Sequence, residues 1–230
     1  MTGLGKEWFD IVNTLLKVSS YYRELNNAIS FGRDIKVRRE AVERFLKNPK
    51  TVLDLGAGDG SLTEIVLDKY PNIDLLIMLD VLPEMLLKAK KAPNIEKIQA
   101  VFEYLPFRDS VFDYALAAFS LRDAIDLERA LNEISNVLGG AGKLIVVDLG
   151  KPSNLLKRHL INFYWTIIAP LHAFLRLGFK GLSSIKIKKT LKFYPTTNQL
   201  LHIYNRYFHQ TVLVEKFMGS VIILEASKIA

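Results

Sequence analysis

The sequence predicts an α/β fold in which a doubly wound, mostly parallel sheet carries helices on both faces. Two observations lead to this prediction. Strand-like and helix-like segments alternate five times between residues 51 and 149, and the strand-like segments are almost purely aliphatic. A chain of 230 residues, 50% of them hydrophobic, is long enough for one such domain and hardly for two. Ligands of such sheets bind beyond the carboxyl ends of the strands, so we expect a site there.

The segment before the first strand is helical. Residues 8–46 have helical spacing, with turn chemistry only around Ser30, Phe31 and Gly32. This predicts two helices flanking a short link, and we expect them to cap the site. Residues 1–9 contain no basic region followed by an apolar signal core, and the chain has no cysteine. We therefore expect a cytoplasmic protein without disulfides or cysteine chemistry.

A strand, a glycine loop and a helix come next. The β-prone run over residues 51–55 ends in three alternate glycines, Gly56, Gly58 and Gly60. Glycine permits positive φ angles and lets a ligand approach the main chain without meeting a Cβ. Ser61 and Glu64 have the spacing of a capping box, which predicts a helix from about Ser61. Residues 73–79 predict a second buried strand ending at Asp80, so this segment is a βαβ unit.

The acids and the glycine spacing of this unit indicate its ligand. An acid at the tip of the second strand, here Asp80, accepts hydrogen bonds from ribose hydroxyls. The spacing G-x-G-x-G differs from the dinucleotide fingerprint G-x-G-x-x-G, and Asp54 and Asp59 beside the loop repel a pyrophosphate. The same acids suit a positively charged ligand. The pattern therefore favours S-adenosylmethionine, with NAD as one alternative and a glycine turn without a ligand as the other.

The elements after Asp80 continue the alternation. They are a helix over 83–91 with proline in its first turn, a strand over 97–102, a loop over 103–110, a strand over 111–118, a helix over 126–138, a glycine loop over 139–142 and a strand over 143–149. The carboxyl ends of the strands should converge on one crevice. These ends are residues 54–60, Asp80, 102–103, 118–122 and Asp148.

Beyond Asp148 the alternation gives way to a basic, aromatic-rich segment. The net charge is +7, and residues 151–214 hold ten of the 31 Lys and Arg, none of the 24 Asp and Glu, and all four His. Residues 155–177 form an apolar helical stretch of almost membrane-spanning length. Polar residues and a proline interrupt it, which predicts a buried or interfacial helix pair instead of a span. The interruptions are Asn162, Pro170, His172 and Arg176.

The last part of the chain contains a basic run, a helix and a hairpin. The run is Lys186-Ile187-Lys188-Lys189, and the helix covers residues 197–207. Two strands over 210–216 and 220–226 should pair as a hairpin turned at Met218 and Gly219. The basic segment has three interpretations: a lid that closes the crevice, a lid that also lies on an anionic membrane, or a surface that contacts RNA through lysines and aromatic rings.

Five pieces of the sequence together resemble the ubiquinone and menaquinone biosynthesis C-methyltransferases, a branch of the class I S-adenosylmethionine-dependent methyltransferases. The pieces are Tyr22-Arg-Glu-Leu-Asn26 with Ser30-Phe31-Gly32, the loop 54–60, Leu79-Asp80-Val-Leu-Pro-Glu-Met85-Leu86, Glu103-Tyr-Leu-Pro-Phe107 and Ala118-Phe119-Ser120-Leu121-Arg122-Asp123. The chain departs from the family pattern at Arg23, Asp123 and Asp148, where the family has Asp, Asn and Glu. Val101-Phe102 also replaces a polar residue of the family, so we expect the backbone N–H of Phe102 to meet the adenine.

The resemblance implies a Rossmann-like sheet of seven strands with a C-terminal antiparallel hairpin. The predicted layout is one methyltransferase domain with a helical cap over 1–48, a cofactor-binding core over 49–150, a helical lid over 151–207 and the hairpin over 208–230. The resemblance also implies that Asp59, Asp80, the Val101-Phe102 segment and Ala118 line the cofactor pocket. The strand-end positions Asp54, Gly56, Gly58, Gly60, Val81 and Glu103 complete the predicted cofactor site.

The implied reaction is methylation of a ring carbon of a prenylated quinol, which makes a lipophilic small molecule the expected partner. Arg122 follows a strand end, where its cation can stabilise a developing phenolate; a surface arginine paired with Asp123 or Asp126 is the alternative. Asp148 and a histidine of the lid are the candidate proton acceptors. No residues have metal-ligand spacing, so we expect no metal.

Two other functions stay open at this point. One is a methyltransferase that acts on RNA or on another small aromatic or lipid acceptor, and the other is a protein that binds the cofactor without turning it over. We expect no nucleic acid as the principal partner, and a position in the cytoplasm or peripherally at the inner face of a membrane. The sequence leaves the oligomeric state open.

Overall fold

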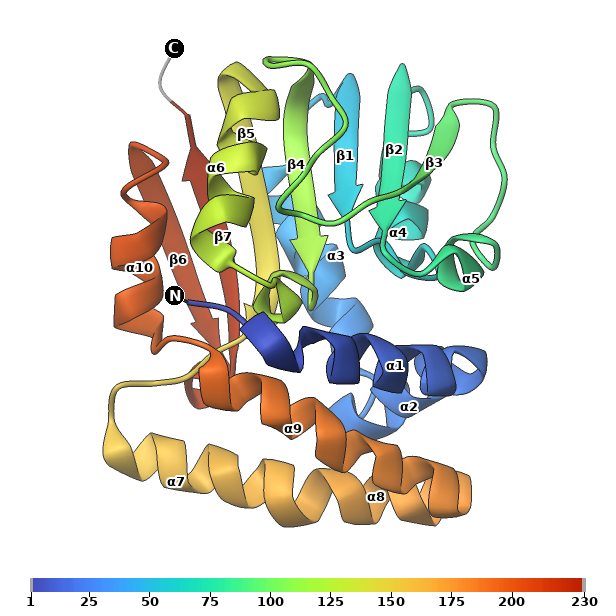
Figure 1. The fold of residues 1–230 in the computed structure, drawn as a ribbon, viewed down its shortest axis with the longest axis vertical. Coiled ribbons are helices and arrows are strands. Elements are labelled where there is room, and N and C mark those ends of the chain that lie inside the picture. The colour runs from blue at the N-terminus through green and yellow to red at the C-terminus, as the bar shows by residue number, and fades with distance from the viewer. Residues whose placement is uncertain (1, 229–230) are drawn as a thin grey trace.

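A seven-stranded sheet forms the centre of the protein, in the order β3-β2-β1-β4-β5-β7-β6 (Figure 1). The computed structural model describes residues 2–228, apart from the side chains of 186–189, so the predicted basic run lies outside the described side chains. The strands are β1 (Thr51–Leu55), β2 (Leu75–Asp80), β3 (Ile95–Gln99), β4 (Phe112–Ala118), β5 (Leu138–Leu149), β6 (Gln210–Lys216) and β7 (Val221–Ser227).

The direction of the strands confirms the predicted fold class. Strands β1 to β5 pair in parallel, with Leu53 beside Ile77 of β2 and Ala115 of β4. Strand β7 runs antiparallel to both β5 and β6, which is the predicted C-terminal hairpin. The chain leaves β1 toward β2 and β3 and then returns to β4 on the other side of β1. The β1/β4 boundary is therefore the switch point, where a crevice forms beyond the strand ends.

Helices cover both faces of the sheet. Helices α3 (Arg33–Phe45) and α4 (Ser61–Lys69) bury apolar side chains such as Val42 and Val66 against one face. Helices α6 (Leu127–Val137) and α10 (Thr197–Tyr204) do the same on the other face, with Leu131 and Tyr204. Helix α10 therefore covers a face of the sheet and is not part of the lid, although the predicted lid, residues 151–207, included it. The short helix α5 (Pro83–Leu86) follows β2.

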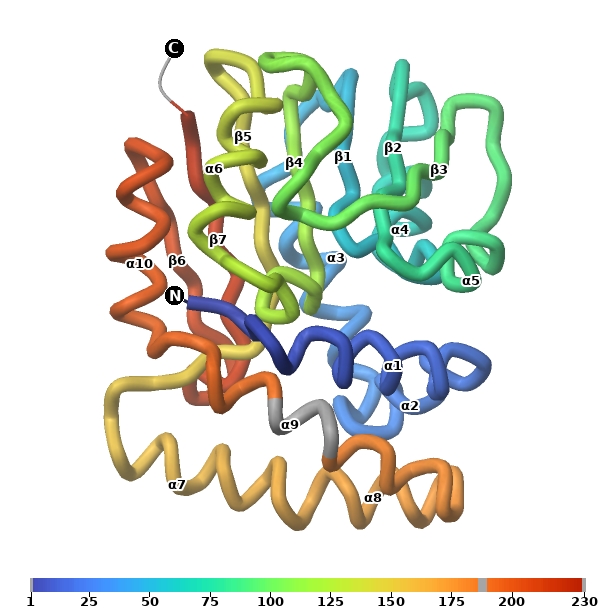
Figure 2. Tube along the Cα trace, in the orientation of Figure 1, coloured from blue at the N-terminus to red at the C-terminus, as the bar shows by residue number. Residues whose placement is uncertain are grey.

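The remaining α-helices lie across the carboxyl ends of the parallel strands, where the arrowheads of β1, β2 and β4 point (Figure 1). They are α1 (Trp8–Val18), α2 (Tyr22–Ser30), α7 (Leu155–Phe163), α8 (Ala169–Leu177) and α9 (Ser184–Phe193). Helix α1 lies beside the much later α9, and α2 lies beside α8 (Figure 2). Short 3-10 turns occur at Gly5–Glu7, Ser19–Tyr21, Leu121–Asp123, Gly178–Ser183 and Phe217–Gly219.

Several predicted elements differ from the structure in detail. The predicted link at Ser30, Phe31 and Gly32 is confirmed, with Phe31 and Gly32 in left-handed conformations, but three α-helices, not two, occupy the N-terminal segment. The predicted glycine loop 139–142 lies inside β5, where it shifts the register between the pairs Phe112–Leu138 and Tyr114–Lys143. A bulge of this kind keeps a strand continuous despite extra residues. Our prediction of a loop was therefore wrong.

The apolar stretch after Asp148 is one continuous helix, not the predicted helix pair. A π-helical turn at Tyr164–Ile168 joins α7 to α8. Pro170 lies in the first turn of α8 and has no N–H to donate to the preceding turn. The wider π turn accommodates this missing hydrogen bond, so the helix continues through the proline.

Candidate functional site

Two cavities meet at the carboxyl ends of β1 and β4. The strand-end cavity lies over the glycine loop, under α1 and α2, and includes Gly56, Asp80, Phe102 and Ala118 among its lining residues. The apolar cavity, of about 230 Å³, lies between α2, α3, the lid and the hairpin turn. Its lining includes Ile29, Val37, Leu149, Ile161 and Trp165. Phe119, which follows β4 with a positive φ of 61°, lines both cavities.

The glycine loop follows the path that its sequence predicts. The N–H groups of Gly56 and Ala57 both donate to the carbonyl of Leu79, which ties the loop to the end of β2. Gly56 has a φ of +66°, and a Cβ there would lie 2.4 Å from the Cβ of Ser120. Only glycine fits this position, because a side chain would be both strained and blocked. The loop thus holds its main chain at the floor of the strand-end cavity.

Asp80 connects the loop to the end of β2. One of its carboxylate oxygens accepts the N–H of Gly58 at 2.8 Å, and the other accepts the N–H of Leu82 at 2.9 Å. Burial raises the pKa of Asp80, and the hydrogen bonds from the backbone oppose that shift. A carboxylate oxygen can accept a second hydrogen bond. Asp80 lines the cavity and can therefore organise the loop and meet ligand hydroxyls together.

Asp59 has a cationic partner that the sequence did not predict. Nε of Arg23 donates to Asp59 at 2.9 Å, and the same guanidinium contacts Glu64 at 3.2 Å. Although burial favours the neutral acid, the hydrogen bonds from Arg23 and Ser61 hold the pKa of Asp59 below its ordinary value. The predicted capping box was wrong, because Gly60, with φ 83°, precedes the helix and the Ser61 hydroxyl donates to Asp59. The helix does begin at Ser61, as predicted.

Asp54 lies beneath the loop. It is buried, accepts the hydroxyl of Thr63 at 2.6 Å and borders the strand-end cavity. Burial raises its pKa to about 6, against the lowering effect of the Thr63 hydrogen bond. The carboxyl groups of Asp54, Asp59 and Asp80 therefore surround one polar end of the cavity, as the sequence predicted.

Arg38 is a cavity residue that sequence reasoning missed. The residue is 5% exposed, and its guanidinium pairs with Asp34 at 2.9 Å and stacks over the ring of Phe119 at 4.8 Å. Its Nε has no hydrogen-bond partner among the described residues. A buried donor without a partner costs free energy, so an anionic ligand group is favoured there. The available signal was the position of Arg38 on α3, next to Val37 and three residues before Ala41 on the apolar side of the helix.

These groups fit S-adenosylmethionine. The acids suit its amino group, sulfonium and ribose hydroxyls, and the orphaned Nε of Arg38 suits its carboxylate. Val101 and Phe102 offer apolar contact for a flat base, and Gly56 and Gly58 leave room for close approach of the ligand.

Arg122 and Asp148 form a buried ion pair. Nη1 of Arg122 contacts Asp148 at 2.8 Å, the backbone N–H of Arg122 donates to the same carboxylate at 3.1 Å, and its Nε donates to Thr190 at 3.3 Å. Burial lowers the pKa of Arg122, but Asp123 and Asp148 outweigh this effect and raise it, so the side chain stays cationic. Arg122 lines the apolar cavity, whereas Asp148 is fully buried behind it. The alternative interpretation of Arg122 as a surface arginine is thereby excluded, although its Nε does lie 3.7 Å from Asp123.

Asp123, next in the chain, borders the other cavity. Its side chain is 16% exposed, lines the strand-end cavity and lies 3.7 Å from Nε of Arg122. Oδ1 has no hydrogen-bond partner among the described residues. Burial raises the pKa of Asp123 to about 6, and the Arg122 cation limits the increase. Tyr22 also lines this cavity, and Asn26, one turn further along α2, lines the apolar cavity.

Some predicted site residues lie outside both cavities. Gly60 packs against Ala89 at the start of α4, and Glu103 accepts the N–H of Asp126 at the start of α6. Among the lid histidines, His172 stacks on Phe31 and His159 is exposed, and neither lines the apolar cavity. The predictions of Gly60 and Glu103 as cofactor ligands and of a lid histidine as base therefore lack support. Asp148 lines neither cavity and is linked to the site through Arg122 and through the backbone N–H of Leu149, which donates to it at 2.7 Å.

The other residues predicted to bind the cofactor all line the strand-end cavity. They are Asp54, Gly56, Gly58, Asp59, Asp80, Val81, Val101, Phe102 and Ala118. The described residues contain no cluster of three or more His, Asp or Glu that is arranged to hold a metal ion.

Solved structures share this fold. A SAM-dependent methyltransferase from Thermotoga maritima superposes with a TM-score of 0.65 at 18% identity, over 94% of this chain and 98% of that one. The plantazolicin methyltransferase BpumL in complex with SAH gives a TM-score of 0.68 at 14% identity, over 99% and 95% of the two chains. These similarities confirm the predicted Rossmann-like methyltransferase fold.

Sequence relatives point to a single family. The demethylmenaquinone methyltransferase of Thermus thermophilus is 34% identical over 59% of this chain and 64% of its own length. The ubiquinone/menaquinone biosynthesis C-methyltransferase UbiE of Rickettsia prowazekii is 31% identical over 72% of this chain and 70% of its own. Residues 6–228 match the family model of the ubiE/COQ5 methyltransferase family. The resemblance inferred from the sequence is confirmed, and the chain belongs to the ubiE/COQ5 methyltransferase family.

Proposed function

We propose that this protein transfers a methyl group from S-adenosylmethionine to a ring carbon of a prenylated quinol. One observation carries the proposal: the polar strand-end cavity and the apolar cavity meet at Phe119, with Arg122 lining one and Asp123 lining the other. A charged methyl donor and an oily aromatic acceptor need such neighbouring sites. Membership of the ubiE/COQ5 family, whose relatives carry the names of quinone-pathway methyltransferases, supports the same reaction.

The donor is held by groups of the strand-end cavity. Asp80 would accept the ribose hydroxyls, Arg38 would bind the carboxylate, and the loop at Gly56 and Gly58 would pass close to the amino-acid end. When bound, S-adenosylmethionine supplies an electrophilic methyl group on a positively charged sulfur. The chain has to align this methyl group with the acceptor carbon, and such alignment is worth about 7–11 kcal/mol.

The acceptor ring needs activation, and Arg122 provides one part of it. A phenolate ring carbon is a far better nucleophile than the ring carbon of a neutral phenol. The Arg122 guanidinium, fixed by Asp148 at 2.8 Å, presents a permanent cation to the apolar cavity and can stabilise the phenolate oxygen there. Arginine does not accept protons near neutral pH, so its role is electrostatic. Asp148 positions Arg122 and is not proposed as the proton acceptor.

Asp123 is the proposed proton acceptor. Its Oδ1 lacks a hydrogen-bond partner among the described residues, and its carboxyl group, with a pKa of about 6, is ionised at neutral pH. The hydroxyl proton of the acceptor passes to this carboxylate, and the resulting phenolate forms the new carbon–carbon bond through its ring carbon. With the donor bound, the methyl group would leave its sulfur as the carbon–sulfur bond breaks, and the electron pair of that bond would stay on the sulfur as a neutral thioether. The methylated ring carbon would then lose its own hydrogen as a proton to solvent, which restores the aromatic ring.

The lining of the apolar cavity supports a lipophilic acceptor over RNA. Ile29, Val37, Leu149 and Trp165 offer hydrophobic contact, whereas nucleotides require phosphate contacts. We include in the proposal a cytoplasmic protein with peripheral contact at the inner face of a membrane, because a prenylated acceptor resides in lipid.

A labelled-methyl transfer assay tests the proposal. The protein is incubated with methyl-labelled S-adenosylmethionine, demethylated prenyl quinol and total RNA together, and the products are separated by lipid extraction. Label in the methylated quinol supports the proposal, and label in RNA supports the alternative acceptor. Binding of the donor without transfer to either acceptor would indicate a protein that holds the cofactor without using it.

A further inference from the structure

The lid presents an exposed apolar face. The segment Leu155–Ser183, here called the lid helix, consists of the long helix Leu155–Leu177 and a 3-10 turn, Gly178–Ser183, that follows it after a non-helical Gly178 (φ 60°, ψ −144°). Its 29 residues have the length and hydropathy of a membrane-crossing helix, but only 28% of the most apolar stretch is buried. One stripe of it, with Ile161, Trp165, Ala169 and Ala173, packs against α2 and Leu149. Other apolar side chains of the lid helix remain exposed, among them Leu156 (70%), Leu175 (73%) and Phe179 (84%).

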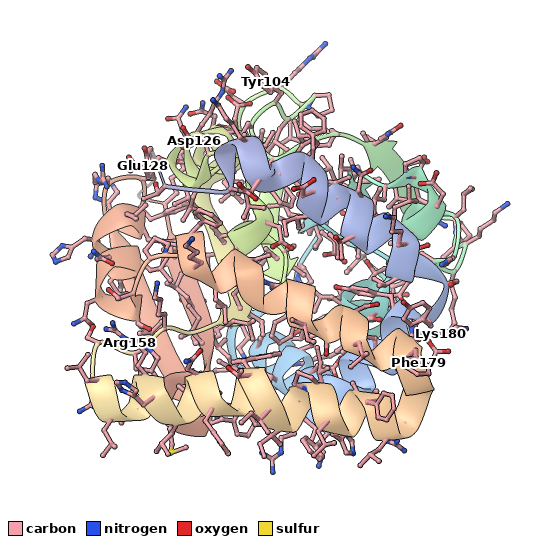
Figure 3. All side chains as sticks on the ribbon, turned by 60° about the horizontal axis from the view of Figure 1, so that its bottom comes forward. Tyr104, Asp126, Glu128, Arg158, Phe179 and Lys180 are labelled. Atoms are coloured by element: carbon pink, nitrogen blue, oxygen red, sulfur yellow. The ribbon has the colours of Figure 1, made fainter. Side chains whose placement is uncertain are left out.

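This face is unusual for a protein surface. The exposed apolar side chains recur along the whole lid helix, from Leu156 through Phe163 and Leu171 to Phe179. Contiguous apolar patches of this extent mark an interaction site. The lid helix forms one edge of the molecule in Figure 1, and Arg158 and Lys180 mark its two ends in Figure 3.

The positive charge of the lid helix indicates which kind of partner fits its exposed apolar face. The lid helix carries Lys157, Arg158, Arg176 and Lys180, and residues 151–214 contain no Asp or Glu. A second copy of the same face would bring these cations together, whereas a bilayer with anionic headgroups complements them. An apolar face flanked by Lys and Arg is the pattern of a helix that lies in the membrane interface.

The packing of the lid helix suits a position on the surface of a membrane and not a position across it. Its buried stripe is fixed on α2, with Trp165 and Ala169 packed near Leu25 and Ile29, so the lipid can reach one face only. A crossing helix would need to separate from this core cluster. An orientation parallel to the bilayer keeps these contacts and immerses the exposed face.

The mouth of the apolar cavity opens beside this face. Leu160 of the lid helix and Met218 of the hairpin turn line the apolar cavity, yet they are 48% and 58% exposed. Phe217, also at the rim, is 42% exposed and lies under the guanidinium of Arg33. A lipid-tailed molecule could thus enter the cavity while its tail stays among apolar side chains.

We propose that the lid helix lies in the plane of an anionic bilayer and brings the mouth of the apolar cavity to the lipid. Its purpose, the entry of a lipid-tailed acceptor, rests on the proposed function, but membrane binding itself does not. The contact combines immersion of leucine and phenylalanine side chains with attraction between the flanking cations and anionic headgroups.

Vesicle sedimentation tests the proposal. The full chain is mixed with vesicles of phosphatidylcholine alone or with an equal part of phosphatidylglycerol, and the bound fraction is measured at low and high salt. We expect tighter binding to the anionic vesicles and weaker binding as salt rises. The double variant Leu171→Ser with Leu175→Ser should lose about tenfold in affinity per leucine. Leu87→Ser, which changes an 80% exposed leucine outside the lid, is the matched control and should bind like the wild type.

Three outcomes would overturn the proposal: no preference for anionic vesicles, equal losses in Leu87→Ser and the double variant, or a dimer in sedimentation velocity that the double variant dissociates. Thermal unfolding of each variant checks that the exposed substitutions leave the fold intact.

Transfer to a short-tailed, water-soluble quinol separates this proposal from the proposed function. Equal transfer by the wild type and the double variant, together with lost vesicle binding in the variant, supports both proposals. Vesicle binding by a wild type that methylates no quinol supports the membrane proposal and refutes the proposed function.

Discussion

Replacing Asp80 with alanine should weaken S-adenosylmethionine binding and loosen the glycine loop at the same time. The carboxylate accepts the N–H of Gly58 at 2.8 Å and that of Leu82 at 2.9 Å, one on each oxygen. Its oxygens also face the strand-end cavity, where ribose hydroxyls would donate to them. Alanine removes all of these acceptors, so the N–H groups of Gly58 and Leu82 must donate to water instead.

The expected magnitude follows from these contacts. A hydrogen bond to a charged group contributes about 1.5–3 kcal/mol, and the ligand hydroxyls would lose such an acceptor. We expect a loss of about 2–3 kcal/mol in binding, or roughly 30- to 150-fold in Kd. The free energy of unfolding of the unliganded protein should fall by about 1–2 kcal/mol, because Asp80 is only partly buried and water can replace part of its role.

Titration calorimetry with S-adenosylmethionine and urea unfolding measure the two effects. Asp74→Ala is the matched control, since Asp74 is an exposed acid just before the opposite end of the same strand, β2. The control should change neither quantity by more than about 0.5 kcal/mol. An unchanged affinity in Asp80→Ala would refute the ribose assignment, and a loss of stability without a loss of affinity would reduce Asp80 to a structural role.

Three further predictions concern other groups of the site. Asp123→Asn should lower the transfer rate by about 10²-fold and abolish the fall of kcat/KM below pH 6 that the ionised wild-type carboxylate implies; an unchanged pH profile would remove Asp123 as the base. Arg38→Lys should lower affinity for S-adenosylmethionine by about tenfold but leave affinity for its decarboxylated analogue unchanged, and calorimetry with both ligands decides this. Asp148→Asn should lower the free energy of unfolding by about 3–5 kcal/mol, whereas Glu225→Gln, at a partly exposed pair, should cost less than about 1 kcal/mol by denaturant unfolding.

The fold could be predicted from the sequence where short sequence patterns or general rules of sheet topology determine it. The aliphatic run of β1, the glycines after it and the hairpin at Met218 are local signals, and the switch-point rule then brings Asp80 and Ala118 to one crevice. The continuous lid helix was not predictable, because a π turn of five residues accommodates Pro170 and no local pattern indicates it.

The site residues that belong to the sheet and its loops could be predicted from the sequence, whereas those that belong to the N-terminal helices could not. Residues of the glycine loop reach the cavity through the backbone of β1. Arg38 reaches the cavity, and Arg23 reaches Asp59 at its lining, only because α2 and α3 pack beside the strand ends. The partner of Asp59 lies 36 residues away in the sequence, so spacing alone cannot indicate it. Long-range packing decides the charges around both cavities.

The consecutive residues Arg122 and Asp123 make chemical sense only as a pair. Proton transfer from a phenol with a pKa near 10 to a carboxylate with a pKa of about 6 is unfavourable by about 5 kcal/mol in the absence of other charges. A buried cation at the phenolate oxygen can offset most of this, and Asp148 fixes that cation within the apolar cavity. Without Arg122, proton transfer from the phenol to Asp123 is too unfavourable. Without Asp123, Arg122 has no proton acceptor beside it. The losses in transfer rate from Asp123→Asn and Arg122→Gln should therefore be strongly non-additive, so that the double variant is barely slower than either single one.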